Sequence, residues 1–538
     1  MIKKIQQDFS YYSHEFKDNY RKGVHRLRTI LASRAQAQAF VSNAGGVAVV
    51  LGYEPDKPDK NAQELYALLA ASPYIDDAVQ TFLGSIYEAG AESQDAMYSD
   101  SARCLEILHD PVMSRAVGAG TVSAGKWIAT LAGQSCAAYT GIAAVAASET
   151  AMTAVAASET AMAAVVGNAT ALNAVVTSQV ALNAVAASET AMAAVIGNAT
   201  ALNVVATSQA AMNAVAASET AMAAVIANST ALNTVVTSPV AMNAVASSYV
   251  AVAALYESAV AVEAVKANET AWATLTGASS AVMGKAAAKL AGLNPADYAD
   301  MAAVAASQTA MAAIASSQTA MAAVINNATA LNAVVSSSTA MAAIASSSTA
   351  MAAIEKSQVA KDAIAASDMA TAKYAVGAAG LNPADYADMA AVASSSTAMA
   401  AVINNATALN AVVSSSTAMA AIASSQTAMA AIASSSTART AITNSATAKN
   451  ALASSPLKTT VTKGNGNGWE NRTIRNGMGY LISCYNANSG GEAGSTWYKL
   501  DGAQTSQPAG TTNVGKFFTS SLAIYWWSST SSVTYIPC

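Results

Sequence analysis

A ten-residue pattern of polar and apolar positions repeats along most of the chain and is clearest between residues 148 and 275. Each unit, here called a decad, starts with Ser or Asn, in most cases has Met or Leu four residues later, and has Val three residues after that. The starting residues are Ser148, Ser158, Asn168, Ser178, Ser188, Asn198, Ser208, Ser218, Asn228, Ser238, Ser248, Ser258 and Asn268. A fixed repeat of this kind constrains the whole fold.

The first residues of each decad are typical of a helix N-terminus. Ser and Asn are preferred N-caps because their side-chain oxygen accepts a free amide hydrogen of the first turn. Pro239 follows Ser238, where the missing N–H costs nothing. Glu149 and Glu189 occupy the same position in their decads, where a negative charge meets the positive end of the helix dipole. The pattern therefore predicts a new helix every ten residues.

Helices of roughly seven residues are too short to be stable alone in water, where about 12–15 residues are needed. Their Met or Leu and Val positions lie on one face, so neighbouring helices must bury that face, as in a solenoid or a trimeric fibre. One unbroken helix with a ten-residue repeat would have about 3.3 residues per turn and would be severely overwound. We therefore expect a mainly α-helical repeat shaft of short, capped helices.

A longer spacing of thirty residues separates Asn168, Asn198 and Asn228. Either three helices make one turn of a solenoid, or the gene grew by duplicating pieces of three decads. The later part of the chain favours duplication, because residues 293–301 recur unchanged as residues 381–389. The decads relax just before these two copies, so we expect joints near 277–292 and 368–380.

These patterns divide the chain into three regions. Residues 1–140 are rich in charges and aromatic residues and are expected to be helical, with Gly118, Gly120 and Gly125 marking turns. Residues 141–455 are expected to form the decad-repeat shaft. Residues 457–538 lose the decads and gain glycines, aromatic residues and alternating β-branched segments, which predicts a small all-β tip domain. The segments expected to be strands are 459–462, 479–483, 496–500, 521–527 and 532–536.

Aromatic side chains are concentrated in the expected β domain. Tyr and Trp give a large contact area with a polar handle, which suits carbohydrate or protein surfaces. The candidate receptor-binding residues are Trp469, Trp497, Tyr498, Trp526 and Trp527. The alternative is that they form the core of the domain or a trimer interface.

Composition and charge exclude several classes of function. Only 11% of the residues are charged, and the net charge of −5 argues against nucleic acid as the main partner. The caps interrupt every apolar stretch, so we expect no membrane insertion. The N-terminus has charges but no apolar segment typical of a secretory signal. An alanine-rich body with so few charges is typical of an assembled shaft.

No pattern of catalytic, cofactor-binding or metal-ligating residues is apparent, so we expect no enzyme and no cofactor. The three histidines, His14, His25 and His109, belong to no recognisable motif. Carboxylates of the C-terminal domain could act as a glycosidase pair, but this is weak support for a depolymerase, the third and least favoured function. These carboxylates are Glu470, Glu492 and Asp501.

The four cysteines lie far apart and have no metal-ligand spacing. They are Cys104, Cys136, Cys484 and Cys538. We expect isolated thiols. The alternative is a Cys484–Cys538 disulfide, which would require that the protein ends up outside a reducing cytosol.

The order of these regions resembles a tailed-bacteriophage tail fibre. The decads, for example residues 218–225 (Ser-Glu-Thr-Ala-Met-Ala-Ala-Val), carry the resemblance in sequence, and the organisation carries it over the rest of the chain. The resemblance implies an N-terminus attached to other virion proteins, a homotrimeric shaft and a C-terminal tip that binds a host-surface glycan or protein. Such a fibre assembles in the host cytoplasm and becomes part of the virion. The chain differs from many fibres in that its shaft is expected to be helical.

The alternative function is a bacterial cell-surface adhesin or a filament subunit. The absence of a recognisable secretory signal favours the phage fibre, because a phage protein assembles in the cytoplasm and leaves by lysis.

Overall fold

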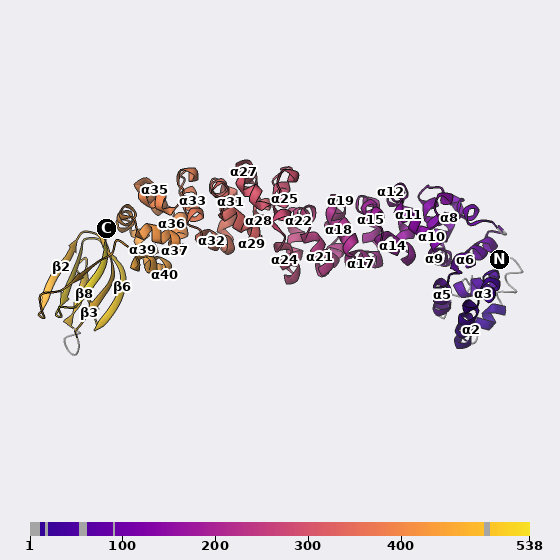
Figure 1. Cartoon of the computed structure of the whole chain (residues 1–538), viewed down its shortest axis with the longest axis horizontal. Helices are drawn as coiled ribbons and strands as arrows, with labels where there is room; N and C mark the ends of the chain where they lie inside the picture. Colours follow the sequence, from indigo (N-terminus) through magenta and orange to yellow (C-terminus); the bar gives the residue numbers. More distant parts are fainter. Residues whose placement is uncertain (1–10, 17–19, 53–61, 90–91, 489–494) are drawn as a thin grey trace. The chain divides into compact units, whose positions relative to one another are not determined.

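A computed structural model of the chain describes residues 11–16, 20–52, 62–89, 92–488 and 495–538. The described part is mostly α-helical and ends in a small all-β domain (Figure 1). The chain divides into two compact units, residues 1–275 and residues 276–538, which are described separately. The predicted combination of a helical body with a C-terminal β domain is confirmed.

The first unit begins with helices of unequal length. They are α2 (Tyr20–Ala32), α3 (Arg34–Val41), α4 (Ala44–Leu51), α5 (Ala62–Ala70), α6 (Ile75–Ile86), α7 (Gln94–Tyr98), α8 (Ser101–His109), α9 (Pro111–Ala119), α10 (Thr121–Leu131) and the 3-10 turn η1 (Cys136–Ala138). Gly120 lies between α9 and α10, as expected for a turn. Gly118 and Gly125, in contrast, lie inside helices, and a Cβ on Gly125 would come within 2.2 Å of the main chain of Gly141.

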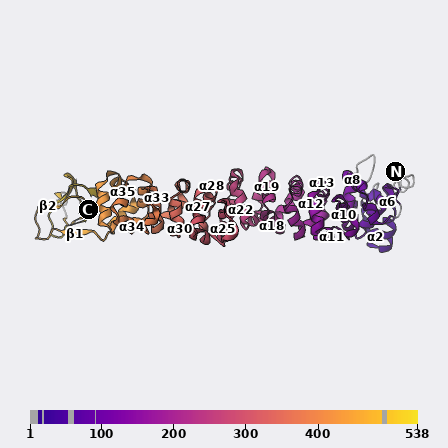
Figure 2. The ribbon, with the colours of Figure 1, turned by 90° about the horizontal axis from the view of Figure 1, so that it is seen from above.

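The rest of this unit consists of helices of six to nine residues. They are α11 (Ile142–Ala147), α12 (Glu149–Ala157), α13 (Glu159–Val166), α14 (Ala169–Val176), α15 (Gln179–Ala186), α16 (Glu189–Ile196), α17 (Ala199–Thr207), α18 (Gln209–Ala217), α19 (Glu219–Ala227), α20 (Ser229–Thr237), α21 (Pro239–Ala246), α22 (Tyr249–Glu257), α23 (Ala259–Lys266) and α24 (Glu269–Thr276). Figure 2 shows the ribbon from a second side.

The second unit has the same kind of helices. They are α25 (Ser280–Leu290), η2 (Pro295–Asp297), α26 (Met301–Ala306), α27 (Gln308–Ser316), α28 (Gln318–Asn326), α29 (Ala328–Val335), α30 (Ser338–Ala345), α31 (Ser348–Glu355), α32 (Gln358–Ala365), α33 (Asp368–Ala378), η3 (Pro383–Asp385), α34 (Met389–Ser394), α35 (Ser396–Asn404), α36 (Ala406–Ser414), α37 (Ser416–Ala423), α38 (Gln426–Ser434), α39 (Ser436–Asn444) and α40 (Ala446–Ala453).

The expected N-caps are observed. The Oγ of Ser188, for example, accepts a hydrogen bond from the amide N–H of Ala191 at 3.2 Å, and Asn198 Oδ1 accepts one from Ala201 at 3.0 Å. At each cap the backbone is extended, with φ −110° and ψ 123° at Ser188, so the preceding helix ends there. Consecutive helices consequently meet at a sharp bend, which is 97° between α14 and α15 and 94° between α29 and α30.

Within each unit, a helix packs against the third helix after it. Helix α12 packs on α15, α15 on α18, and α18 on α21, and α34 packs on α37 and α37 on α40 in the same way. Because three decads span thirty residues, this neighbour coincides with the thirty-residue spacing of the sequence. That spacing therefore has a packing role, in addition to any record of gene duplication.

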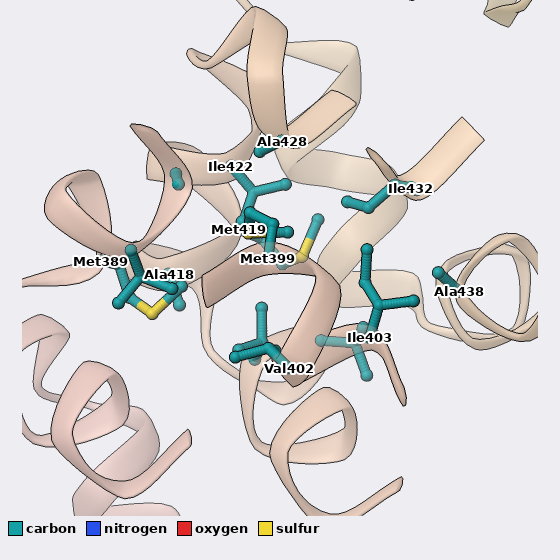
Figure 3. Close-up of a cluster of buried hydrophobic side chains, with 14 of the residues drawn as sticks. Met389, Met399, Val402, Ile403, Ala418, Met419, Ile422, Ala428, Ile432 and Ala438 are labelled. Carbon is teal, nitrogen blue, oxygen red and sulfur yellow. The ribbon is translucent and has the colours of Figure 1, made fainter. Parts of the chain in front are cut away.

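The Met or Leu position and the Ala before it are buried between these helices. Met192 is 2% exposed and Ala191 is fully buried. Figure 3 shows the corresponding cluster in the second unit, where Met399, Met419 and Ile422 point toward one another from neighbouring helices. Full burial of one such side chain stabilises the fold by about 1.5–3 kcal/mol, so this core offsets the low stability of each short helix.

Three segments interrupt the decads in the same way. Each consists of an 11-residue helix, a three-residue 3-10 turn and a six-residue helix, and they begin at α10, α25 and α33. The last two lie at the expected joints, where helix is found in place of looser chain. The first lies within residues 121–147, where no joint was expected.

The C-terminal domain consists of two four-stranded antiparallel sheets, with strand orders β1-β8-β3-β6 and β2-β7-β4-β5. The strands are β1 (Thr459–Thr462), β2 (Glu470–Asn476), β3 (Gly479–Asn486), β4 (Trp497–Leu500), β5 (Ala503–Ser506), β6 (Gly510–Phe518), β7 (Ser521–Trp526) and β8 (Ser532–Pro537). The five predicted strands are present, whereas β2, β5 and β6 were not predicted. All three are edge strands, and the sequences of β2 and β5 are polar.

The β domain packs on the last helices of its unit. Tyr480 and Ile536 join the same apolar cluster as Ile442 and Leu452 of α39 and α40. The side-chain amide of Gln426 also donates a hydrogen bond to the carbonyl oxygen of Pro537 at 3.0 Å. The domain therefore covers apolar side chains of the final decads.

Candidate functional site

The outer face of the sheet β2-β7-β4-β5 gathers most of the candidate aromatic residues. Along β7, Leu522, Ile524 and Trp526 are fully buried, so the alternating residues between them point outward. Tyr525 is one of these outward residues, and it pairs across the sheet with Trp497 of β4. The strand register therefore places two aromatic side chains side by side on the outer face.

Trp469 and Trp527 complete this group. The ring of Tyr525 lies between two tryptophan rings. It stacks on Trp469 with a centroid distance of 4.8 Å and an interplanar angle of 8°, and on Trp497 with a centroid distance of 5.2 Å and an angle of 17°. Trp527 meets Trp469 edge to face at 5.4 Å. These four residues are here called the aromatic face. Each ring pair contributes about 0.5–1.5 kcal/mol beyond area burial, so the packed arrangement of the rings is favourable.

The stacking limits what the aromatic face can offer to a partner. Because Tyr525 has a ring on each side, its two faces are covered and its edge and hydroxyl group remain for contact. Trp469 is 37% exposed. The ammonium group of Lys499 lies 4.6 Å from the ring centroid of Trp497 and adds a positive charge to the same surface. The face therefore presents ring edges, hydrogen-bond donors and a cation.

Two of the five predicted site residues lie elsewhere. Trp526 is fully buried and Tyr498 is 5% exposed, and both belong to the core between the sheets. Strand alternation explains this correction, because each is adjacent in sequence to an outward-facing aromatic residue. Tyr525 was missed for the same reason. Side chains of residues 521–527 point alternately inward and outward, and the sequence alone does not show which of the aromatic residues point outward.

The charge of the C-terminal domain differs from that of the rest of the chain. Residues 457–538 contain six Lys or Arg and three Asp or Glu, a net charge of +3, whereas the whole chain has −5. Lys499 of β4 lies on the face of Tyr525, because it pairs with Ala523, whereas the exposed Arg472 of β2 pairs with Ile524 and lies on the opposite face of the sheet. This balance favours an acidic partner over a basic one.

The carboxylates considered for catalysis have different surroundings. Partial burial alone would raise the pKa of Asp501, but hydrogen bonds from the amides of Thr519, Ser520 and Ser521 outweigh it and lower the pKa to about 2. Asp501 is thus an ionised acceptor that holds the turn at 519–521. Glu470 pairs with Trp526 across β2 and β7, and Glu492 lies outside the described residues.

All four cysteines are free thiols, as predicted. Cys484 is buried between the two sheets, and burial raises the pKa of its thiol to about 12. Cys538 instead packs against the cluster shared with the last helices. Among the described residues, no three or more His, Cys, Asp or Glu side chains gather where they could hold a metal ion.

Aromatic residues near the start of the chain pack on one another. Tyr12 stacks on Phe16 with centroids 5.8 Å apart, and both rings contact Phe40 of α3 edge to face. Phe16 is fully buried, whereas Tyr11 is 60% exposed. Most of this group therefore belongs to a local core, and Tyr11 is the one that can contact another protein.

Comparison with known protein families finds none that matches the chain, and comparison with curated protein sequences finds no significant match. No single helix in the described ranges is long and apolar enough to cross a membrane, although six bent pairs of neighbouring helices reach that length and composition together.

Proposed function

We propose that the chain is a structural fibre protein of a bacteriophage virion, attached through residues 1–140 and contacting the host cell through its C-terminal domain. The observation that carries the proposal is the aromatic face, a group of four packed aromatic side chains with a neighbouring lysine, in a domain that follows a helical repeat region poor in charge. A body of interchangeable decads suits a spacer, and a distinct terminal domain suits recognition.

The helical body is, in this proposal, a solenoid with three decads per turn. Packing of each helix on the third following one supports it, as do the bends between consecutive helices. One chain buries its own Met and Leu positions, so that a homotrimer would have to form through other surfaces. Trimerisation remains part of the proposal only through the resemblance to phage fibres.

The partner that suits the aromatic face best is an acidic polymer of the host surface, such as a charged glycan. Ring edges and indole N–H groups are electropositive, and Lys499 adds charge of the same sign. A host protein with an acidic patch would use the same groups. A surface adhesin of a bacterium would do so as well, and the association of the chain with purified virions separates that alternative from the fibre.

The test is adsorption of particles that carry the double variant Trp497→Ala, Tyr525→Ala. We expect the fibre to remain on the particles and adsorption to cells to fall at least about tenfold, since an aromatic anchor often contributes 2 kcal/mol or more. Tyr485→Ala is the matched control, because Tyr485 is 43% exposed but belongs to the other sheet. Normal adsorption of the double variant would refute the assignment of the aromatic face.

A further inference from the structure

A cavity of about 260 Å³ lies between the helices α31, α32, α33 and α36 of the second unit. Its polar lining includes Glu355, Gln358, Lys361, Asp362, Tyr374 and Asn410. The volume is close to the lower end of ligand pockets in proteins, which is about 300 Å³. A molecule of the size of an amino acid or a monosaccharide fits such a space.

The charged residues of this region concentrate at the cavity. Between residues 301 and 438, the sequence has charges only in the interrupting segment 368–388 and at Glu355, Lys356, Lys361 and Asp362. Three of the last four line the cavity. Every other decad of the stretch is uncharged, so the charges mark a local departure from an otherwise regular pattern.

Lys361 stands where other decads have a buried Met or Leu. Met341 and Met399 occupy this position in two nearby decads and are almost fully buried, whereas Lys361 is only partly buried, as is Met351 of the decad immediately before it. The other charged residues at this position after Ser307 are Arg439 and Lys449, in the last two decads. A lysine here gives up apolar burial, and local exceptions of this kind are typical of functional sites.

The carboxylates are held in place by neighbours. The hydroxyl group of Tyr374, which is 2% exposed, donates a hydrogen bond to Glu355 Oε1. Gln358 Nε2 donates one to Asp362 Oδ1 at 2.7 Å. Each carboxylate keeps a second oxygen for another donor. The ammonium group of Lys361 forms no ion pair within the described ranges of the chain.

We propose that this cavity binds a basic α-amino acid, free or at the end of a peptide, with its carboxylate at Lys361 and its two ammonium groups at Glu355 and Asp362. Two carboxylates and one ammonium group in the wall complement a ligand with two ammonium groups and one carboxylate. Amide and hydroxyl groups of Asn410 and Thr407, on the α36 side of the cavity, supply further hydrogen bonds. This site is independent of the aromatic face and of the proposed fibre.

Calorimetric titration of the full chain with L-lysine tests the proposal. We expect saturable binding, and at least about tenfold weaker binding of L-norleucine, which lacks the second ammonium group, and of cadaverine, which lacks the carboxylate. Failure of L-lysine to bind, or equal binding of cadaverine, would overturn it.

A variant that restores the regular decad sequence at this site tests the roles of Lys361 and Asp362. The double substitution Lys361→Met, Asp362→Ala turns residues 357–364 into Ser-Gln-Val-Ala-Met-Ala-Ala-Ile, which differs from residues 425–432 at one position only. We expect this variant to fold with an equal or higher melting temperature and to lose L-lysine binding. Asp362→Asn, at an exposed position where other decads have Asn332 or Asn410, should weaken binding without affecting folding. Unchanged binding by either variant would contradict the proposal.

Discussion

The hydroxyl group of Ser178 donates a hydrogen bond of 2.5 Å to the main-chain carbonyl oxygen of Ala146, 32 residues earlier. The hydroxyl oxygen of Ser178 also accepts a hydrogen bond from the amide of Ala181 in its own helix at 3.3 Å. The N-cap thus also ties its helix, α15, to the end of α11, the fourth helix before it. The same link, with the same separation, joins Ser188 to Ala156, Ser238 to Ala206, Ser248 to Ala216, Ser347 to Ala315, Ser425 to Ala393 and Ser455 to Ala423.

The double role of the cap predicts a large effect of removing one hydroxyl group. Ser248→Ala loses the cap, which typically costs about 1 kcal/mol, and leaves the carbonyl oxygen of Ala216 without its donor, which costs about 1–3 kcal/mol more. We expect chemical denaturation to show a loss of roughly 2–3 kcal/mol in the free energy of unfolding of this part.

Ser247→Ala is the control for this prediction. The Ser247 hydroxyl group is exposed and donates only to the carbonyl oxygen of Asn243 in its own helix. Its removal should change stability by less than about 0.5 kcal/mol. Equal effects at the two neighbouring positions would show that the link to Ala216 has no energetic role.

A second prediction concerns the buried Met and Leu positions. Met192→Asp places an unpaired carboxylate at a site that is 2% exposed, which costs several kcal/mol, on the order of the largest single-residue effects. We expect partial unfolding of the decads around α16, seen as a loss of helical circular dichroism. The neighbouring Ala193 is exposed, so Ala193→Asp should leave the signal nearly unchanged. If Met192→Asp has the same helical circular dichroism as wild type, the side chain at this position is exposed to solvent and the prediction is wrong.

The caps and the core positions could be predicted from the sequence because each depends on local chemistry. Ser188 must satisfy the amide of Ala191 whatever surrounds it, and Met192 and Val195 lie on one face of any helix that starts there. The packing partner was harder to predict, since the sequence pattern is the same in every decad. The thirty-residue spacing of Asn168, Asn198 and Asn228 was the available signal, but the recurrence of residues 293–301 favoured duplication as its explanation.

The first interrupting segment was missed because it lacks the Asn-Pro pair of the other two. Its equivalents of Asn294 and Pro295 are Ser135 and Cys136. Leu131-Ala-Gly133 repeats as Leu290-Ala-Gly292, with left-handed glycines at φ +72° and +74°. Lys126 in α10 and Lys373 in α33 also occupy equivalent positions, five residues after the first residue of each helix. Each donates a hydrogen bond to a main-chain carbonyl oxygen after its helix, Lys126 to Tyr139 and Lys373 to Pro383. These shared residues were the signal that could have located it.

The aromatic face could be predicted only in part. Composition pointed to the right domain, and three of the five candidates, Trp469, Trp497 and Trp527, lie on one surface. The sequence Tyr525-Trp526-Trp527 does not reveal which ring points outward, because a shift of one residue exchanges the two faces of a strand. The register of β7 against β2 and β4 is set by the whole sandwich, including the edge strands β2 and β5, whose polar sequences gave no strand signal.

Asp501 predicts how the stability of the C-terminal domain depends on pH. Its pKa of about 2 in the folded chain is below the value of about 3.9 expected when unfolded. A carboxyl group with a depressed pKa stabilises the fold fully above the unfolded value, and this contribution is lost as the pH falls through the folded value. Asp501→Asn should therefore be less stable than wild type at pH 7, and the difference should shrink as the pH approaches 2.

Tryptophan fluorescence is the measurement for this effect, because four of the six tryptophans lie in the C-terminal domain. Asp501 is exposed, so the effect is small and is best measured at low ionic strength. A difference between Asp501→Asn and wild type that is constant from pH 7 to pH 2 would show that the hydrogen bonds to Thr519 and Ser520 do not favour the ionised form.

Removal of residues 456–538 should destabilise the final helices as well as remove the candidate recognition surface. Tyr480 and Ile536 of the β domain complete the apolar cluster that contains Ile442 and Leu452, and an exposed cluster of this kind promotes association. We expect a chain that ends at Ser455 to form soluble aggregates in light scattering and to melt at a lower temperature than the full chain. The full-length variant Trp497→Ala, Tyr525→Ala keeps Tyr480 and Ile536 and should remain as dispersed as wild type. If the truncated chain is equally dispersed and equally stable, the contact between the β domain and α40 is not a stabilising one, and loss of adsorption after truncation can then be assigned to recognition alone.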